Sequence, residues 1–153
     1  MLITLLLSAA LLQAVNPCDT NVQGPFIVTS ARSFTVQWCT TSTRQNADGT
    51  AVPERIDGFY FVLDGGVKQD IGMATALGLS SITNRHAWQY AMPSGVSRGD
   101  HSAGIIAWNF LLDSDGQPTT TRVESAPTVV PFSAVDPVSN QPPLAPTGGR
   151  IIK

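Results

Sequence analysis

The chain has 153 residues, of which 13% are charged, and its formal net charge is -2. This length fits one domain that is large enough to bury its own core without metals or many disulfides. The nine Lys and Arg residues are scattered singly, so the sequence lacks the basic patch of a nucleic-acid-binding protein, and no nucleic-acid partner is expected.

The N-terminal stretch MLITLLLSAALL carries no charged side chain. It is too short to span a bilayer as a helix, which needs roughly 20 apolar residues. Its length suits the apolar core of a secretory signal peptide, and Ala14 supplies a small residue for cleavage. We therefore predict a signal peptide over residues 1–14, no stable membrane span, and a secreted or cell-envelope location, extracellular or periplasmic. Because the stretch lacks Lys and Arg, an uncleaved first strand or anchor helix of a structural protein is the alternative.

Two cysteines, Cys18 and Cys39, are present. In an exported chain, a disulfide between them is the simplest interpretation. A strand predicted over residues 25–30 should pair antiparallel with the next strand, over residues 33–40, which would bring the two sulfurs together. Two free thiols or a catalytic thiol are the alternatives, although no CxxC spacing or neighbouring base favours catalysis. Two cysteines alone cannot complete a zinc site.

The stretch Ser33–Thr40 alternates strictly between two faces, as a strand with one buried face does. Phe34, Val36 and Trp38 share the face that we expect to be buried, because aromatic and β-branched residues favour a half-covered sheet. Cys39 lies on the other face.

The middle of the chain predicts short strands joined by turns. Thr41–Arg55 is polar and predicts a long loop. Asp57–Gly66 predicts a strand that closes in an Asp-Gly turn, and Val67–Ile71 predicts a short returning strand. Met73–Ser80 predicts a loop or a weak edge strand, because Gly72 and Gly78 interrupt any helical turn.

The second half of the chain continues the same pattern, without a helical period of useful length. Strands are predicted over residues 83–92, 101–112 and 119–125, with a turn at 113–116, and an edge strand over 128–132. Prolines then become frequent, and residues 133–153 predict an extended Pro-rich tail.

About seven short strands, spaced roughly ten residues apart, indicate an all-β, antiparallel β-sandwich over residues 15–132. The chain resembles a fibronectin type III or related immunoglobulin-like module. Residues 34–38 resemble its second strand, residues 57–65 its third, with Phe59 as the expected aromatic, and residues 101–109 its sixth. His101 stands where the family has a corner tyrosine, and its imidazole can still donate a hydrogen bond to a nearby backbone carbonyl.

The sequence does not indicate an enzyme. His86 and His101 are the histidines of the chain, and no Gly-x-Ser-x-Gly elbow is present to aim a serine. Asp113 opens a segment that places Glu124 at the twelfth position of a calcium loop, but Gly116 falls at the fourth place and not the sixth. We interpret this segment as a hairpin turn, and we expect no catalytic residue, metal or cofactor.

One group of side chains is a candidate binding patch. Tyr60, Val62, Ile106 and Trp108 should share the outward face of neighbouring strands. An exposed apolar patch of this kind can bind a protein, a glycan or a second copy of the chain. The alternative is that loops or the Pro-rich tail cover it.

The resemblance implies a non-enzymatic, exported module that acts in adhesion, binding or envelope structure, although fold alone does not decide function. The alternative is a self-assembling structural subunit, such as an extracellular filament or virion component. Its hydrophobic N-terminal segment and C-terminal tail would make contacts between subunits by strand addition to a sheet edge.

Overall fold

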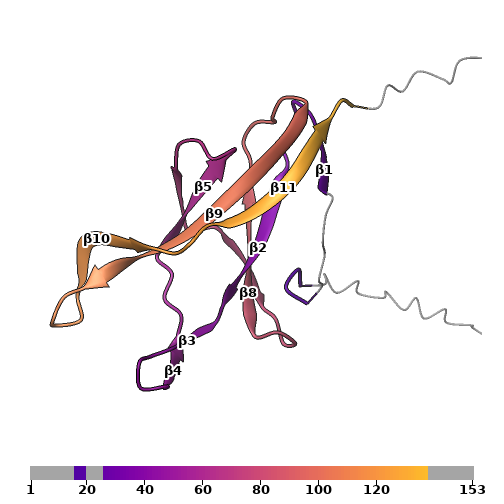
Figure 1. Cartoon of the computed structure of the whole chain (residues 1–153). Coiled ribbons are helices and arrows are strands. Elements are labelled where there is room, and N and C mark those ends of the chain that lie inside the picture. Colours follow the sequence, from indigo (N-terminus) through magenta and orange to yellow (C-terminus); the bar gives the residue numbers. More distant parts are fainter. Residues whose placement is uncertain (1–15, 20–25, 138–153) are drawn as a thin grey trace, which may run out of the picture.

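The structure is a computed structural model that describes residues 16–19 and 26–137 of the chain. Strands are the regular structure of these residues, which confirms the all-β prediction (Figure 1). The described part contains no helix that is long and apolar enough to cross a membrane. The predicted signal peptide and residues 138–153 of the predicted tail lie outside the described residues.

Eleven strands are described, more than the seven or so that the sequence predicts, because short strands form inside predicted loops. Six of them make the larger sheet, whose order is β1-β11-β9-β5-β6, with β10 paired to β9. Its strands are β1 (Phe26–Thr29), β5 (Gly58–Leu63), β6 (Gln69–Gly72), β9 (Gly99–Leu112), β10 (Pro118–Glu124) and β11 (Thr128–Val135).

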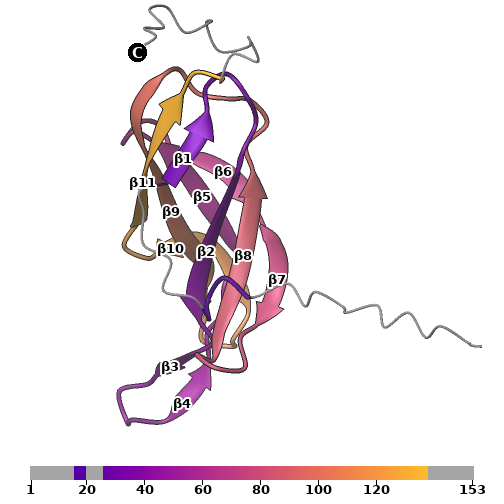
Figure 2. The ribbon, with the colours of Figure 1, turned by 90° about the vertical axis from the view of Figure 1, so that its right-hand side faces the viewer.

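A smaller sheet has the order β2-β8-β7, formed by β2 (Thr35–Thr41), β8 (Arg85–Ala91) and β7 (Thr75–Leu79). Figure 2 shows this sheet as a layer over the larger sheet. A third pair, β3 (Thr43–Gln45) and β4 (Ala51–Pro53), forms a hairpin within the stretch predicted to be a loop. The layered arrangement is compatible with a β-sandwich.

The core lies between the two layers and is built from the strict alternation of their strands. In β2, Val36 and Trp38 are buried, while Thr35 and Gln37 on the opposite face are exposed, as the sequence predicts. Trp38 packs its ring against Phe59 of β5, with centroids 5.1 Å apart. Phe59 is completely buried, and burying one such side chain contributes about 1.5–3 kcal/mol. The aromatic pairs therefore hold the two layers together.

The Asp-Gly turn predicted after β5 is present. Asp64 and Gly65 have φ values of 51° and 67°, and the backbone N–H of Gly66 donates to the Leu63 carbonyl at 2.9 Å. Two successive positive φ angles are the requirement of a type I′ hairpin turn, which Asp-Gly meets. The chain then returns as β6, which confirms the short strand predicted there.

The predicted pairing of the first two strands is wrong. Strand β1 pairs in parallel with β11, and β2 pairs with β8. A two-residue hairpin needs residues that accept positive φ, and Ala31-Arg32 offers neither Gly nor Asn. Instead, Ala31 alone takes a φ of 56°, and its N–H donates to the Val96 carbonyl, so the chain crosses from one sheet to the other.

Two uncertain segments also become strands. Strand β7 forms the edge predicted as one option for Met73–Ser80, because Gly78 with a φ of 106° is absorbed as a bulge. Strand β11 was expected at an edge but lies between β1 and β9 and continues to Val135, beyond the expected domain end at 132. Pro131 falls in the part of β11 that pairs with β9 alone, since β1 begins opposite Phe132.

Two hairpins project from the same end of the molecule. Strand β9 is long enough to pair with β11 over its first half and with β10 over its second half. The β9–β10 hairpin therefore extends past the body of the sheet, and the β3–β4 hairpin extends beside it (Figures 1 and 2). A cleft lies between these two hairpins.

Candidate functional site

The Cys18–Cys39 disulfide predicted from the sequence is present, with its Cα atoms 5.8 Å apart. It does not arise from pairing of β1 with β2. Instead, residues 16–19 lie against the β7–β8 turn, where the Thr83 hydroxyl donates to the Cys18 carbonyl at 3.2 Å and Ser80 bonds to Asp19. Both cysteines of the chain are used, so neither is a free or catalytic thiol.

The candidate patch is assembled but is not open. Tyr60 lies opposite Ile106 in the β5–β9 ladder, and its ring centroid is 6.1 Å from that of Trp108. Ile106 and Trp108 are 7% and 6% exposed, and Tyr60 and Val62 are half-buried. Ile106 and Trp108 are therefore covered, and binding at these four residues stays a prediction.

Arg122 of β10 lies over Trp108 in this patch. The Arg122 guanidinium carbon lies 3.8 Å from the Trp108 ring centroid. Its Nη1 donates to the Tyr60 hydroxyl at 2.7 Å and to Asp70 Oδ2 at 2.6 Å. The Tyr60 hydroxyl and then the Asp70 carboxylate raise the pKa of Arg122. The backbone N–H of Gly72 and then Arg122 lower the pKa of Asp70.

Gly58 is the residue that allows Trp108 to lie flat on the sheet. A Cβ atom at this position would lie 2.2 Å from Cζ2 of Trp108. The backbone φ of Gly58 does not require glycine. Glycine is required because the indole of Trp108 fills the space that a Cβ atom would need. The stack formed by Tyr60, Trp108 and Arg122 therefore depends on a glycine directly beneath the indole. These side chains stabilise the sheet.

His101 makes two hydrogen bonds near the start of β9. Its Nε2 lies 2.9 Å from the Ser97 carbonyl and its Nδ1 lies 2.8 Å from Asp64 Oδ2. A carbonyl and a carboxylate only accept hydrogen bonds, so both bonds exist together only when the imidazole is protonated. Asp64 first, and then the Ser97 carbonyl, raise the pKa of His101. His101 in turn lowers the pKa of Asp64, and this pairing fixes the start of β9.

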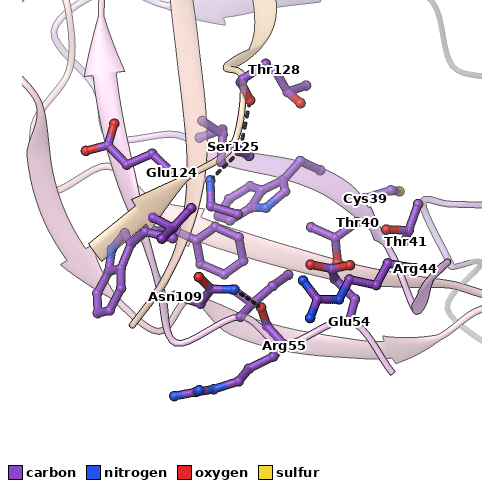
Figure 3. A pocket seen from close by; sticks show the side chains of 18 of the residues that line it. Cys39, Thr40, Thr41, Arg44, Glu54, Arg55, Asn109, Glu124, Ser125 and Thr128 are labelled. Carbon is purple, nitrogen blue, oxygen red and sulfur yellow. Dashed lines mark hydrogen bonds between the residues drawn. The ribbon is translucent and has the colours of Figure 1, made fainter. Parts of the chain in front are cut away.

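A cleft of about 480 Å³ lies between the two projecting hairpins (Figure 3). We call it the hairpin cleft. Trp38, Phe59, Ile105 and Ala107 form its apolar floor, from the facing sides of the two sheets. The β9–β10 side contributes Asn109, Val123, Glu124 and Ser125, and the opposite side contributes Thr40, Thr41, Arg44 and Glu54.

A bond network around Asp57 holds one wall of the hairpin cleft in place. The Asp57 carboxylate pairs with Arg55 at 2.7 Å and accepts from the Phe110 N–H at 2.8 Å. Asn109 Nδ2 donates to the Arg55 carbonyl at 3.3 Å, as Figure 3 shows. These bonds connect the chain before β5 to the base of the β9–β10 hairpin, so this wall is preorganised.

The charges in the hairpin cleft are unequally compensated. Arg55 pairs with Asp57, and Glu124 pairs with Lys68. Arg44 and Arg85 have no carboxylate within 4.0 Å among the described residues, and Glu54 has no cation there. Arg85 donates only to the Cys39 carbonyl, at 3.4 Å. The cleft therefore has two uncompensated guanidinium groups and one uncompensated carboxylate.

Sequence reasoning did not find the hairpin cleft. Its residues come from stretches scattered between residues 38 and 128, and its arginines appear as single charges. The one local signal is the polar segment Thr41–Arg55, which supplies Arg44 and Glu54 and predicts only a long loop.

The structure brings together no group of three or more His, Cys, Asp or Glu residues able to hold a metal within its described ranges. Asp113 Oδ1 accepts from the N–H groups of Asp115 and Gln117, which closes the β9–β10 turn. Glu124 lies at the far end of β10 and pairs with Lys68. The residues counted as a calcium loop therefore form a hairpin, as preferred from the sequence.

Comparisons with protein-family models, with curated proteins and with solved structures found no match to this chain.

Proposed function

We propose that this chain is an exported, non-enzymatic, immunoglobulin-like module of the fibronectin type III kind that binds a partner in the hairpin cleft. The observation that carries the proposal is the cleft itself. It is preformed by two hairpins, has an apolar floor, and has polar groups with unused bonding capacity on its walls. Binding sites combine these features, with a volume of roughly 300–1,000 Å³.

The strand order supports the immunoglobulin-like part of the proposal. In such sandwiches the second, fifth and fourth strands share one sheet, while the third, sixth and seventh share the other. Here β2, β8 and β7 would be the first group, and β5, β9 and β11 the second, with β6 added beside β5. The His101 bond to Ser97, four residues earlier, supports the same assignment because it occupies the place of the tyrosine corner.

The disulfide supports export, because such bonds persist mainly in oxidising compartments. A signal peptide over residues 1–14 remains part of the proposal. Intact-mass measurement of the native protein tests it directly: we expect loss of residues 1–14 and of two hydrogens from the cysteines. Retention of Met1 on the native protein would instead support the structural-subunit alternative.

Binding through the cleft is tested on arrays of peptides and glycans with a blocking variant. Val123 lines the cleft and is 48% exposed, so Val123→Arg should fill the opening without disturbing the core. The matched control is Val67→Arg, because Val67 is 92% exposed and lies outside the cleft. We expect Val123→Arg to lose binding to the peptides or glycans that the wild type binds, and Val67→Arg to keep it. Equal binding by both variants, or an empty array with the wild type, contradicts the proposal.

A second candidate function, self-assembly as a structural subunit, is favoured by the edge strand β7. The segment Ile71–Asn84 has no charged residue, and Met73 and Leu79 are 53% and 52% exposed. Among the described strands β7 pairs with β8 alone, and native edges usually carry charges that block strand addition. Part of this edge is occupied, since Asn16 donates to the Gly78 carbonyl.

Sedimentation across a range of protein concentrations separates the two candidates. An assembly that uses β7 should dissociate in Leu77→Lys, because Leu77 is exposed and the new charge would face a neighbouring chain. Ile27→Lys is the control, on the edge strand β1 of the other sheet. A wild type that stays monomeric at all concentrations rules out the second candidate.

A further inference from the structure

The chemistry of the hairpin cleft identifies a ligand class, and this step rests on the proposed binding function. The cleft volume of about 480 Å³ suits one short segment and not the broad face of a folded domain. Its two sides belong to different hairpins, so a guest lying between them contacts Val123 on one side and Arg44 on the other.

The backbone at the mouth of the cleft favours a peptide. Residues Cys39, Thr40 and Thr41 of β2 line the cleft, and β2 pairs with β8 alone among the described strands. One side of β2 therefore has N–H and C=O groups that no strand of the described sheets uses, and a peptide would compete with Arg85 for the Cys39 carbonyl. An extended peptide binds such an edge by adding a strand, with its alternate side chains directed into neighbouring pockets.

The charges favour a carboxylate on that peptide. Arg44 and Arg85 both line the cleft without a carboxylate partner among the described residues. A guanidinium binds a carboxylate through two parallel hydrogen bonds, the strongest pairing open to it. Glu54 on the same side limits how much negative charge the cleft accepts, so one or two acidic residues fit better than a long acidic run.

The floor selects the neighbouring side chain. Trp38, Phe59 and Ile105 are buried at 5%, 0% and 3% exposure, and all three line the cleft. An apolar side chain directed at this floor would bury its own surface against apolar groups, which favours binding. We propose that the hairpin cleft binds an extended peptide segment along the free edge of β2, with an acidic residue paired to Arg44 and Arg85 and an apolar residue on the Trp38 floor.

The test uses the full, disulfide-bonded protein and labelled peptides of about eight residues that alternate Val and Thr, a pattern suited to strand addition. Three versions carry Glu, Gln or Lys at the same two positions, and fluorescence anisotropy measures their binding. We expect the Glu peptide to bind at least about tenfold more tightly than the Gln peptide, and the Lys peptide not to bind. Added salt should weaken the Glu peptide most.

Substitutions in the protein show whether Arg44 and Arg85 bind the acidic side chains of the peptide. Arg44→Gln and Arg85→Gln should each weaken the Glu peptide by about tenfold and leave the Gln peptide unchanged. Arg32→Gln makes the same charge change outside the cleft, in the connection from β1 to β2, and should have no effect. Methylation of alternate peptide nitrogens should also abolish binding, because it removes the donors that a strand edge requires.

The outcomes distinguish this inference from the function it rests on. Equal affinity for the Glu and Gln peptides overturns the acidic preference, and full affinity of the methylated peptide overturns strand addition. If no peptide binds while an array glycan is still blocked by Val123→Arg, the ligand class is wrong and the binding function stands. If nothing binds at the cleft, both fail.

Discussion

At the scale of single residues, Gly58 and Trp108 show how one missing methyl group permits a ring contact. We expect Gly58→Ala to lower the free energy of unfolding by about 1–3 kcal/mol, because the added Cβ would overlap the buried indole. Trp108 cannot move away easily, since Arg122 lies on its other face. Urea denaturation measures the change.

The control for this prediction is Gly104→Ala, in the strand that pairs with β5. A Cβ there meets Val62 at 3.4 Å, an ordinary contact, and its φ is not in the left-handed region. We expect little loss, because the alanine also restricts the unfolded chain. Equal denaturation midpoints for the two variants would show that the indole does not constrain position 58.

His101 makes stability depend on pH. Its pKa is raised by Asp64 and the Ser97 carbonyl, so its stabilising contribution is complete below its unfolded value of about 6.5. The contribution is lost as the pH rises through the higher folded pKa. Asp64 has a lowered pKa, so its contribution is present above about pH 4 and is lost as the pH falls through the folded value. The pair is therefore strongest between about pH 4 and pH 6.5.

Thermal denaturation across pH tests this assignment. The wild type should lose stability above about pH 6.5, and His101→Gln should flatten that decline. The nearby Asp100 also raises the pKa of His101, so the decline should shift to lower pH in Asp100→Asn. His86→Gln serves as the control, because His86 makes no ion pair among the described residues. An unchanged pH profile in His101→Gln would remove His101 as the cause.

At the scale of the strand, Arg122 connects β10 to β5 and β6. We expect Arg122→Ala to lower the free energy of unfolding, because stacking on Trp108 and the bonds to Tyr60 and Asp70 are lost. Arg122→Lys should recover less than half of that loss, because an ammonium group cannot stack on the Trp108 ring as the planar guanidinium does.

A double-mutant cycle separates the two kinds of contact. Asp70→Asn combined with Arg122→Ala measures the coupling between the charges, which should be small because Asp70 is 42% exposed. The part of the destabilisation by Arg122→Ala that this coupling does not account for comes from lost stacking on the aromatic rings. If Arg122→Lys is as stable as the wild type, charge alone is enough and the stacking interpretation is wrong.

The strand scale is also where prediction from sequence succeeds and then stops. Alternating side chains identify β2, β5, β8 and β9, and the Asp64-Gly65 turn is encoded locally. The partner of β1 is not encoded locally, since β11 lies about a hundred residues away along the chain. The exposure of Tyr60 likewise depends on Arg122, which is 62 residues away in sequence.

At the scale of the whole molecule, the candidate site also depends on residues that are distant in sequence. The disulfide was predicted correctly although the pairing used to argue it was wrong, because the even cysteine count carried the prediction independently. The hairpin cleft could not be predicted in this way. It exists only because β9 extends beyond β11 and the β3–β4 hairpin projects beside it, and neither length is visible as a motif.

The disulfide is also the clearest determinant of stability across the molecule, because it joins residues 16–19 to the end of β2. Its sequence separation is 21, and closing a loop of this size contributes about 3 kcal/mol through the unfolded chain. We expect Cys18→Ser combined with Cys39→Ser to lower the free energy of unfolding by about this amount in urea. The wild type in reducing buffer should match the double variant.

Ala87, which is 1% exposed opposite Cys39, should exchange its amide hydrogen faster in the double variant, because residues 16–19 no longer remain over that face. A double variant as stable as the oxidised wild type would mean that Thr83 and Ser80 alone hold this segment in place.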